Sequence, residues 1–206
     1  MKPSIILLFI VTLIFSQENI KEIVKENSVN FSIDPALILG IIEAESNFKN
    51  HVVSKKKAIG LMQIVPKTAG IEANKYLNND NSIPHDTILM NPENNIKYGC
   101  AMITVLNKRY FKKIKNNQSK MYCVIAAYNT GAFNVTKAFV NKSDTDTIEN
   151  FDSLNKYQRA KINLDITIQK INSMSHDTVL ETMKENLPHY ETVAYLDKVI
   201  NNMKKY

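Results

Sequence analysis

Helix start signals recur along this chain, and they constrain its fold more than any other feature. Asp34-Pro35 indicates an N-cap and a first helical residue, because an Asp side chain accepts hydrogen bonds from open backbone N–H groups and Pro needs no partner there. Asn91-Pro92-Glu93 repeats this arrangement, with an acidic residue where the helix dipole favours negative charge. Pro66 and Pro188 suit two further helix starts. The sequence therefore predicts a mainly helical protein.

Composition supports the same fold class. The chain has 206 residues, 44% of them hydrophobic, with only 5 Gly and 6 Pro, which suits one compact helical domain after a leader. We expect an all-α fold with a C-terminal helical extension and polar loops at residues 78–91 and 141–150. Helices are predicted at about residues 18–30, 35–47, 66–77, 92–114, 119–129, 132–140, 153–173, 176–186 and 188–204.

The first 16 residues differ in character from the rest. One Lys precedes an apolar run from Ile5 to Phe15, which is shorter than an ordinary membrane span. This pattern predicts a signal peptide over residues 1–16, with an uncleaved N-terminal membrane anchor as the alternative. Export would permit a disulfide between Cys100 and Cys123. Both cysteines lie in apolar helical patterns, however, so two buried thiols fit at least as well.

Charge and ligand types exclude several classes of protein. A net charge of +6 favours polyanions, including nucleic acid, anionic lipid and acidic cell-wall polymers. The Lys residues are scattered and no nucleic-acid-binding motif is present, so we expect no nucleic-acid partner. The two Cys have no metal-site spacing and the His residues are isolated in the sequence, so we expect no metal and no cofactor. Those His residues are His51, His85, His176 and His189.

One acidic residue stands out at the end of an apolar helix. On a helical wheel Glu45 falls within the stripe of Leu37, Ile38, Ile41, Ile42 and Phe48, whereas Glu43 falls on the opposite side with Ala36, Gly40 and Asn47. A carboxyl group among apolar neighbours should have a raised pKa, which suits a general acid. A surface Glu at a fraying helix end is the equally weighted alternative.

A second segment combines a helix end with sugar-binding chemistry. Gly131 follows an apolar helix that ends in Tyr128-Asn129, and it can adopt the left-handed conformation that stops a helix. A Tyr ring can cover the apolar face of a pyranose, and an amide can bond hydroxyl and N-acetyl groups. On these residues alone, an ordinary helix C-cap with a half-buried Tyr is the more probable interpretation.

Several motifs together resemble the lytic transglycosylases of bacterial cell walls, the SLT-domain family with a goose-lysozyme-like fold. They occur in the family's order from about residue 34 to residue 200. The tail around Ile171–Met174 and Asp177–Leu180 is most similar to the membrane-bound murein transglycosylase C branch. The motifs are Glu45-Ser46-x-Phe48, Gly60-Leu61-Met62-Gln63-Ile64, Asn91–Ile96 with Gly99, Ala126–Gly131, and Pro188 with Glu191-Thr192 and Tyr195.

The resemblance implies a role for each matching residue. Glu45 stands at the position of the family's catalytic acid. The implied substrate-binding residues are Ser54, Met62, Gln63, Tyr128, Asn129 and Glu191. Residues 17–206 would then form one SLT-type catalytic domain that acts on peptidoglycan glycan strands in the periplasm or cell envelope, with or without membrane association. Envelope or secretion-system proteins are further candidate partners.

The implied reaction uses one acid rather than two. Glycosidases ordinarily pair two carboxylates, and no second acid pairs with Glu45 by a recognisable motif. The family cleaves the β-1,4 bond between N-acetylmuramic acid and N-acetylglucosamine and forms a 1,6-anhydromuramyl product, with a single Glu acting as acid and then as base. Two alternatives remain: a goose-type lysozyme hydrolase, and a non-catalytic peptidoglycan-binding component of an envelope or secretion machine.

Overall fold

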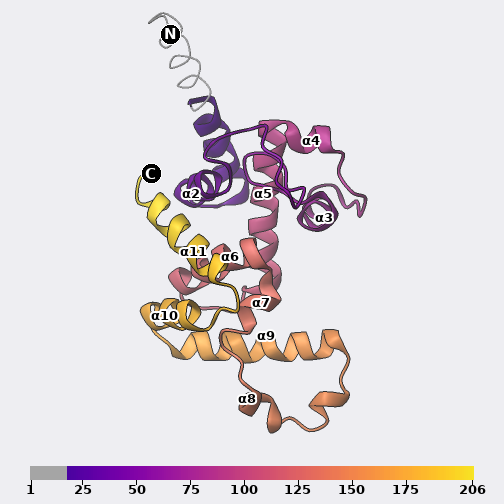
Figure 1. Ribbon diagram of the computed structural model, residues 1–206, viewed down its shortest axis with the longest axis vertical. Coiled ribbons are helices and arrows are strands. Elements are labelled where there is room, and N and C mark those ends of the chain that lie inside the picture. The colour runs from indigo at the N-terminus through magenta and orange to yellow at the C-terminus, as the bar shows by residue number, and fades with distance from the viewer. Residues whose placement is uncertain (1–17) are drawn as a thin grey trace, which may run out of the picture. The chain divides into compact units, whose positions relative to one another are not determined.

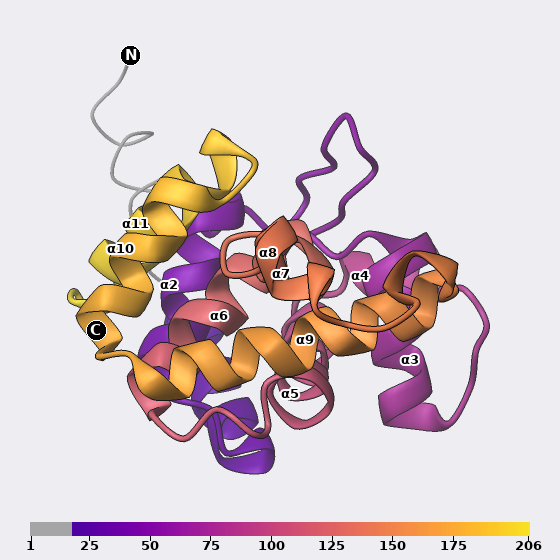
Figure 2. The same cartoon turned by 90° about the horizontal axis from the view of Figure 1, so that it is seen from below.

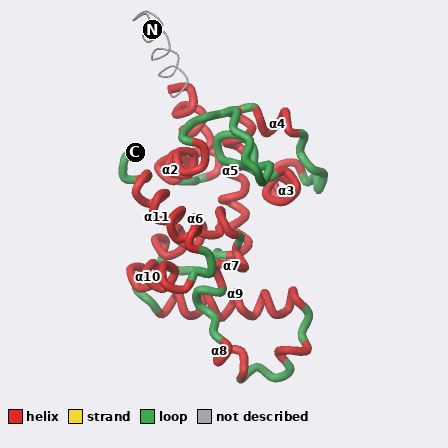
Figure 3. The backbone as a smooth tube through the Cα atoms, in the orientation of Figure 1, coloured by secondary structure: helices red, strands yellow, loops and turns green. Residues whose placement is uncertain are grey.

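The computed structural model describes residues 18–206, and Figure 1 shows the order of their elements. The predicted signal peptide or anchor of residues 1–16 lies outside the described residues. Within residues 18–206 the regular structure is helical, and the only extended pairing is a set of isolated β-bridges at Val53, Ile59 and Ile64 (Figure 3). The predicted all-α class is confirmed.

The chain divides into two compact units. The first contains the described residues up to Thr104 together with Val199–Tyr206, and the second contains Val105–Lys198. Each boundary falls inside a helix, the first within α5 (Pro92–Val105) and the second within α11 (Tyr190–Met203). That residues 17–206 act as one catalytic domain stays a prediction.

The first unit begins with a helix over residues 18–31 and continues through most of the shared helix α5. Both predicted N-caps are confirmed. The Asp34 carboxylate accepts from the Ala36 N–H at 2.9 Å, and the Asn91 side chain accepts from the Asn94 N–H at 3.0 Å. The elements after the first helix are α2 (Pro35–Ser46), a π-helical turn (Pro66–Gly70), α3 (Ile71–Asn78), α4 (Asp86–Met90) and α5 (Pro92–Val105).

Helix α2 is surrounded by apolar packing on more than one face. Ile38, Ile41 and Ile42 are fully buried, as the apolar stripe predicted. Gly40, on the other side of the wheel, is buried as well, because Met203 and Val199 pack against it. Both faces of the helix are therefore fixed within the first unit.

The second unit is built around a buried helix. Helix α6 packs against α7 and α10, and α7 packs against the 18-residue helix α9 (Figure 2). The Asn172 side chain on α9 pairs with the backbone of Lys113 and Lys115 at 3.0 and 2.8 Å, which ties α9 to the segment before α6. The elements are a π-helical turn (Leu106–Tyr110), α6 (Asn117–Thr130), α7 (Ala132–Thr136), α8 (Lys142–Asp146), a 3₁₀ turn (Phe151–Ser153), α9 (Lys156–Ser173), α10 (His176–Asn186) and α11 (Tyr190–Met203).

Two predicted polar loops are partly wrong. Helix α4 lies within residues 78–91 and is capped by the His85 ring, which accepts from the Thr87 N–H at 3.3 Å. Helix α8 lies within residues 141–150, where the Asp144 carboxylate accepts from the Asn141 N–H at 2.7 Å. Each helix has five residues, which is too short to produce a visible apolar period.

Cys100 and Cys123 are free, buried thiols, one in each unit. The interpretation as two buried thiols is confirmed. Burial raises the pKa of each thiol to about 12. Among residues 18–206, no helix has the length and apolar character needed to cross a membrane.

Candidate functional site

Glu45 lies in the last turn of α2 and is half-buried. The helix on which it stands is anchored in the core of the first unit through Ile41 and Ile42. The next residue, Ser46, is buried and donates its hydroxyl proton to the Ile42 carbonyl at 3.0 Å. The acid is therefore carried by a packed helix end rather than by a loop.

The chain turns sharply directly after this acid. Asn47 and Phe48 both have left-handed backbones, with φ values of 50° and 62°. Asn tolerates this conformation, but a bulky residue such as Phe adopts it at a cost of about 1–2 kcal/mol. The Phe48 ring contacts the Tyr206 ring edge-on at a centroid distance of 6.3 Å. Strain of this kind persists where surrounding contacts over-determine the backbone.

Glu43, two residues before Glu45, has defined partners. Lys205 Nζ donates to one of its carboxylate oxygens, and the Tyr206 hydroxyl donates to the other at 2.9 Å. Asn202 completes the attachment by donating its side-chain amide to the Gly40 carbonyl at 3.2 Å. Glu43 is therefore the charged anchor of the C-terminal segment on α2, which separates its role from that expected of Glu45.

The loop after α2 folds back on itself through short backbone pairings. Ile59 and Ile64 exchange two hydrogen bonds at 3.0 Å, and the Gly60 N–H donates to the Val52 carbonyl at 2.9 Å. Ser54 closes a turn within this loop, because its hydroxyl oxygen accepts from the Ala58 N–H at 3.0 Å. The structure thus gives the Ser54 side chain a turn-forming contact.

Asn95 on α5 holds this loop in place. Its side-chain amide donates to the carbonyls of Ile59 at 2.9 Å and Leu89 at 2.7 Å, and its side-chain oxygen accepts from the Met62 N–H at 2.8 Å. The Asn95 side chain is fully buried. The sequence places Asn95 in a motif but indicates no role for it, because two of its partners, Ile59 and Met62, lie 36 and 33 residues away.

Two glycines make room for these contacts. Gly60 has a φ of +78°, and a Cβ atom there would lie 2.3 Å from the Asn95 side-chain nitrogen. A Cβ atom on Gly99 would lie 2.2 Å from the Met62 sulfur. Met62 itself is fully buried. Its side chain therefore packs the loop onto α5, and a groove-lining role would require it to become accessible.

Gln63 is half-buried and has a left-handed backbone with a φ of 47°. Its side-chain amide donates to the carbonyls of Gly60 at 2.9 Å and Val52 at 3.2 Å. Within residues 18–206, its side-chain oxygen Oε1 has no donor. The amide is thus fixed at its nitrogen end, and its oxygen can accept a hydrogen bond from a ligand.

In the second unit, Tyr128 and Asn129 lie in the last turn of α6. Tyr128 is half-buried and Asn129 is exposed. Gly131 ends the helix, and its N–H donates to the Ala127 carbonyl at 2.7 Å. Its φ of 86° and ψ of 149° lie in a region of backbone conformation that is accessible almost only to glycine. Gly131 stops the helix with a positive φ, as predicted, but its ψ of 149° differs from the left-handed helical conformation that the sequence analysis expected.

A side-chain bond links this turn to the start of α11. The Thr192 hydroxyl donates to the Asn129 side-chain oxygen at 2.9 Å across a separation of 63 residues. Thr192 is buried, and its neighbour Glu191 is exposed on the first turn of the helix. The structure therefore brings together two of the quoted motifs, Ala126–Gly131 and Glu191-Thr192.

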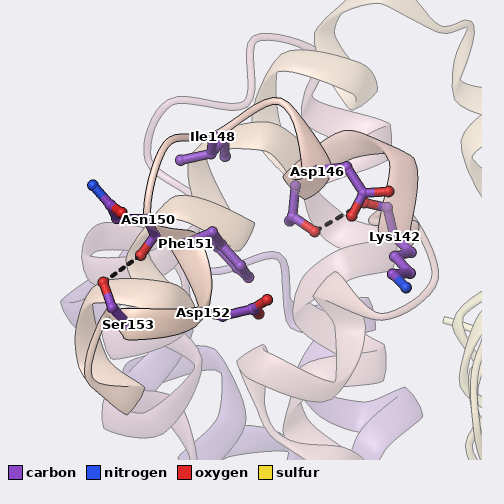
Figure 4. A pocket seen from close by; sticks show the side chains of 8 residues that line it. Lys142, Asp146, Ile148, Asn150, Phe151, Asp152 and Ser153 are labelled. Carbon is purple, nitrogen blue, oxygen red and sulfur yellow. Dashed lines mark hydrogen bonds between the residues drawn. The ribbon is translucent and has the colours of Figure 1, made fainter.

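The predicted site residues divide between the two units. Glu45, Ser54, Met62 and Gln63 belong to the first unit, and Tyr128, Asn129 and Glu191 belong to the second. A separate pocket in the second unit is formed by the segment after α7, and none of the predicted site residues lines it (Figure 4). Two hydrogen bonds brace this pocket, from Thr145 to the Lys142 carbonyl at 2.9 Å and from Ser153 to the Asn150 carbonyl at 2.7 Å.

The described residues form a helical fold in which an acid lies at the end of a buried helix. The loop that follows the acid packs onto a second helix, α5. The family model for the Transglycosylase SLT domain matches residues 22–151. The chain therefore belongs to the transglycosylase SLT domain family, and the resemblance inferred from the motifs is confirmed. The expected lysozyme-like fold class is confirmed with it.

Individual relatives agree with this family. The membrane-bound lytic murein transglycosylase C of Photorhabdus laumondii is 35% identical over 184 residues, which cover 89% of this chain and 45% of the relative. The protein of the same description from Actinobacillus pleuropneumoniae is 36% identical over 186 residues, covering 89% of this chain and 44% of the relative. The chain thus spans less than half the length of these relatives.

Proposed function

We propose that this chain is a peptidoglycan lytic transglycosylase. It cleaves the β-1,4 bond between N-acetylmuramic acid and N-acetylglucosamine and leaves a 1,6-anhydromuramyl end. The observation that carries the proposal is the position of Glu45 at the packed end of α2 in a chain of the SLT family. The name of the relatives, lytic murein transglycosylase, supports the same activity.

Glu45 is proposed to act first as an acid. Its protonated carboxyl group gives a proton to the glycosidic oxygen, and the bond from that oxygen to C1 of the muramyl sugar breaks. The N-acetyl oxygen of the same sugar assists departure by bonding to C1. This step requires Glu45 to carry its proton when the glycan binds.

Glu45 then acts as a base. Its carboxylate removes the proton from the C6 hydroxyl, and the C6 oxygen attacks C1 to close the 1,6-anhydro ring as the N-acetyl oxygen leaves. The proton count returns to its starting state and no water is consumed. Attack by a hydroxyl on the same sugar is favoured over capture of water because the nucleophile is already oriented. This accounts for a site with one acid in place of the usual pair.

The remaining site residues are proposed to bind the glycan. Gln63 offers its side-chain oxygen to an N-acetyl N–H or a sugar hydroxyl, since its nitrogen is held by the Gly60 carbonyl. Tyr128 offers a half-buried ring to a pyranose face, and Asn129 and Glu191 offer polar groups beside it. Ser54 and Met62 are proposed to shape the groove wall, Met62 through its packing against Gly99.

The proposed location is the cell envelope, after export. The relatives are described as membrane-bound, which supports association of this chain with the envelope. A net charge of +6 suits an acidic wall polymer. Envelope or secretion-system proteins are proposed as further partners.

The test is digestion of purified peptidoglycan by the wild-type protein and by Glu45→Gln, with products identified by mass spectrometry. We expect anhydromuramyl ends from the wild type and none from Glu45→Gln. Glu93→Gln is the control variant and should cleave normally, because Glu93 is exposed in the first turn of α5. Reducing ends would instead identify a goose-type lysozyme hydrolase. Binding without cleavage by the wild type would identify a non-catalytic peptidoglycan-binding component.

A further inference from the structure

We propose that Lys205 and Tyr206 are positioning residues for Glu45, acting through Glu43 and Phe48 at the end of α2. We call these four residues the clasp. The inference rests on the proposed function, because it assigns the clasp the task of holding the acid in its reactive place. All of its members belong to the first unit.

The contacts within the clasp engage α2 and the turn after it at the same time. Lys205 and Tyr206 occupy the two carboxylate oxygens of Glu43, and the Tyr206 ring packs edge-on against Phe48. Lys205 Nζ is in turn oriented by the Asn202 side-chain oxygen at 3.0 Å. The C-terminal segment thus holds α2 two residues before Glu45 and holds the chain again three residues after it.

These two attachments, at Glu43 and at Phe48, matter because the last turn of a helix is its least constrained part. The final carbonyls of a helix lack intrahelical partners, and the terminal turn frays readily. Here the turn is followed by two residues with left-handed backbones, Asn47 and Phe48, which relax unless outside contacts hold them. A shift of about 1 Å in a catalytic group can cost roughly a hundredfold in rate.

The hydroxyl of Tyr206 is suited to a permanent donor role. Partial desolvation, followed by the hydrogen bond to Glu43 and its negative charge, raises the pKa of Tyr206 to about 12. The hydroxyl therefore keeps its proton throughout the neutral range and continues to donate to the Glu43 carboxylate.

The experiment compares steady-state cleavage of soluble glycan strands by the wild type, Lys205→Met, Tyr206→Phe and the double variant. Lys113→Met and Tyr157→Phe serve as matched controls, since Lys113 pairs with Asp165 at an exposed site and Tyr157 is 84% exposed. We expect kcat to fall about tenfold in each single variant, with KM unchanged, because the acid is displaced and substrate contacts are kept. Lys205→Arg, which retains the ion pair, should restore most of the rate.

Thermal unfolding is measured on the same proteins. Tyr206→Phe keeps the ring contact with Phe48, so this variant tests the clasp even if the double variant unfolds. A wild-type kcat in Tyr206→Phe and Lys205→Met overturns the proposal. Parallel changes in kcat and KM that follow the loss of stability also overturn it, since they indicate a purely structural role. Cleavage by Glu45→Gln would instead refute the proposed function, so the two failures are distinguishable.

Discussion

At the scale of single residues, Asn95 organises more of the candidate site than any residue selected from the sequence. One buried amide satisfies the backbone groups of Ile59, Met62 and Leu89. Glycines in the loop and Asn in the α5 motif are visible in the sequence. The sequence does not show which carbonyl accepts from which amide, because the partners of Asn95 lie up to 36 residues away. Residue types could therefore be predicted, but the contacts that give them roles could not.

Replacing Asn95 by Ala should lower the free energy of unfolding by about 3 kcal/mol, because several buried backbone groups lose their partners together. Chemical denaturation of the variant and the wild type measures this difference. Asn94→Ala, at the neighbouring position, should stay within about 0.5 kcal/mol of the wild type. Equal stability of the two variants would refute the role of Asn95 in holding the loop on α5.

Gly60→Ala should also destabilise the protein, by about 2 kcal/mol or more, since an added Cβ meets the Asn95 amide and the backbone has a positive φ. The two substitutions should be only partly additive, because removing the Asn95 side chain removes the two nearest atoms with which the new methyl group collides, whereas the Leu89 carbonyl oxygen at 2.8 Å remains. A double-mutant cycle in denaturant measures this coupling. Strict additivity would mean that the requirement for Gly60 comes from its backbone conformation and from the Leu89 carbonyl, and that Asn95 does not contribute to it.

At the scale of elements, long helices with side-chain caps were predictable and short ones were not. Asp34-Pro35 and Asn91-Pro92 mark real helix starts, because capping is a local interaction between adjacent residues. Helices α4 and α8 were missed because five residues show no period. The wheel placed Glu43 opposite Glu45, but it could not reveal that residues 202–206 attach to that side of α2.

The N-cap of α2 provides a direct test at this scale. Asp34→Ala should lower the free energy of unfolding by about 1 kcal/mol, because the Ala36 N–H loses its acceptor. Asp34→Asn keeps a side-chain oxygen and should retain most of the stability. Thermal melts of both variants measure the effect, and equal melting temperatures for Ala and Asn would exclude a capping contribution.

At the scale of the whole molecule, family motifs carried the inference further than periodicity did. Periodicity predicts helices, whereas the order of five motifs predicts an SLT domain, and the family match over residues 22–151 agrees. The division into two compact units was not predictable, since its boundaries fall inside the continuous helices α5 and α11. No break in composition marks either boundary.

Buried thiols in both units should make the stability of the protein fall at high pH. Burial raises the pKa of Cys100 and Cys123 from an ordinary value of 9.0 to about 12 in the folded chain. Their contribution is fully present below pH 9 and is lost as pH rises toward 12, because the unfolded chain releases its thiol protons first. Urea unfolding at several pH values measures this slope. A Cys100→Ala, Cys123→Ala variant should show a shallower slope, and an unchanged slope would contradict the assignment.

The clasp has a consequence for the order in which the protein is made. Glu43 and Lys205 are separated by 162 residues, and Glu43 and Tyr206 by 163. Ribosomes therefore complete α2 long before they add the residues that hold its end. A nascent chain released before residue 205 would contain every proposed binding residue and the proposed acid, yet lack Lys205 and Tyr206, which donate to Glu43. On this view, the proposed acid reaches its full rate of glycan cleavage only after residues 205 and 206 have been synthesised.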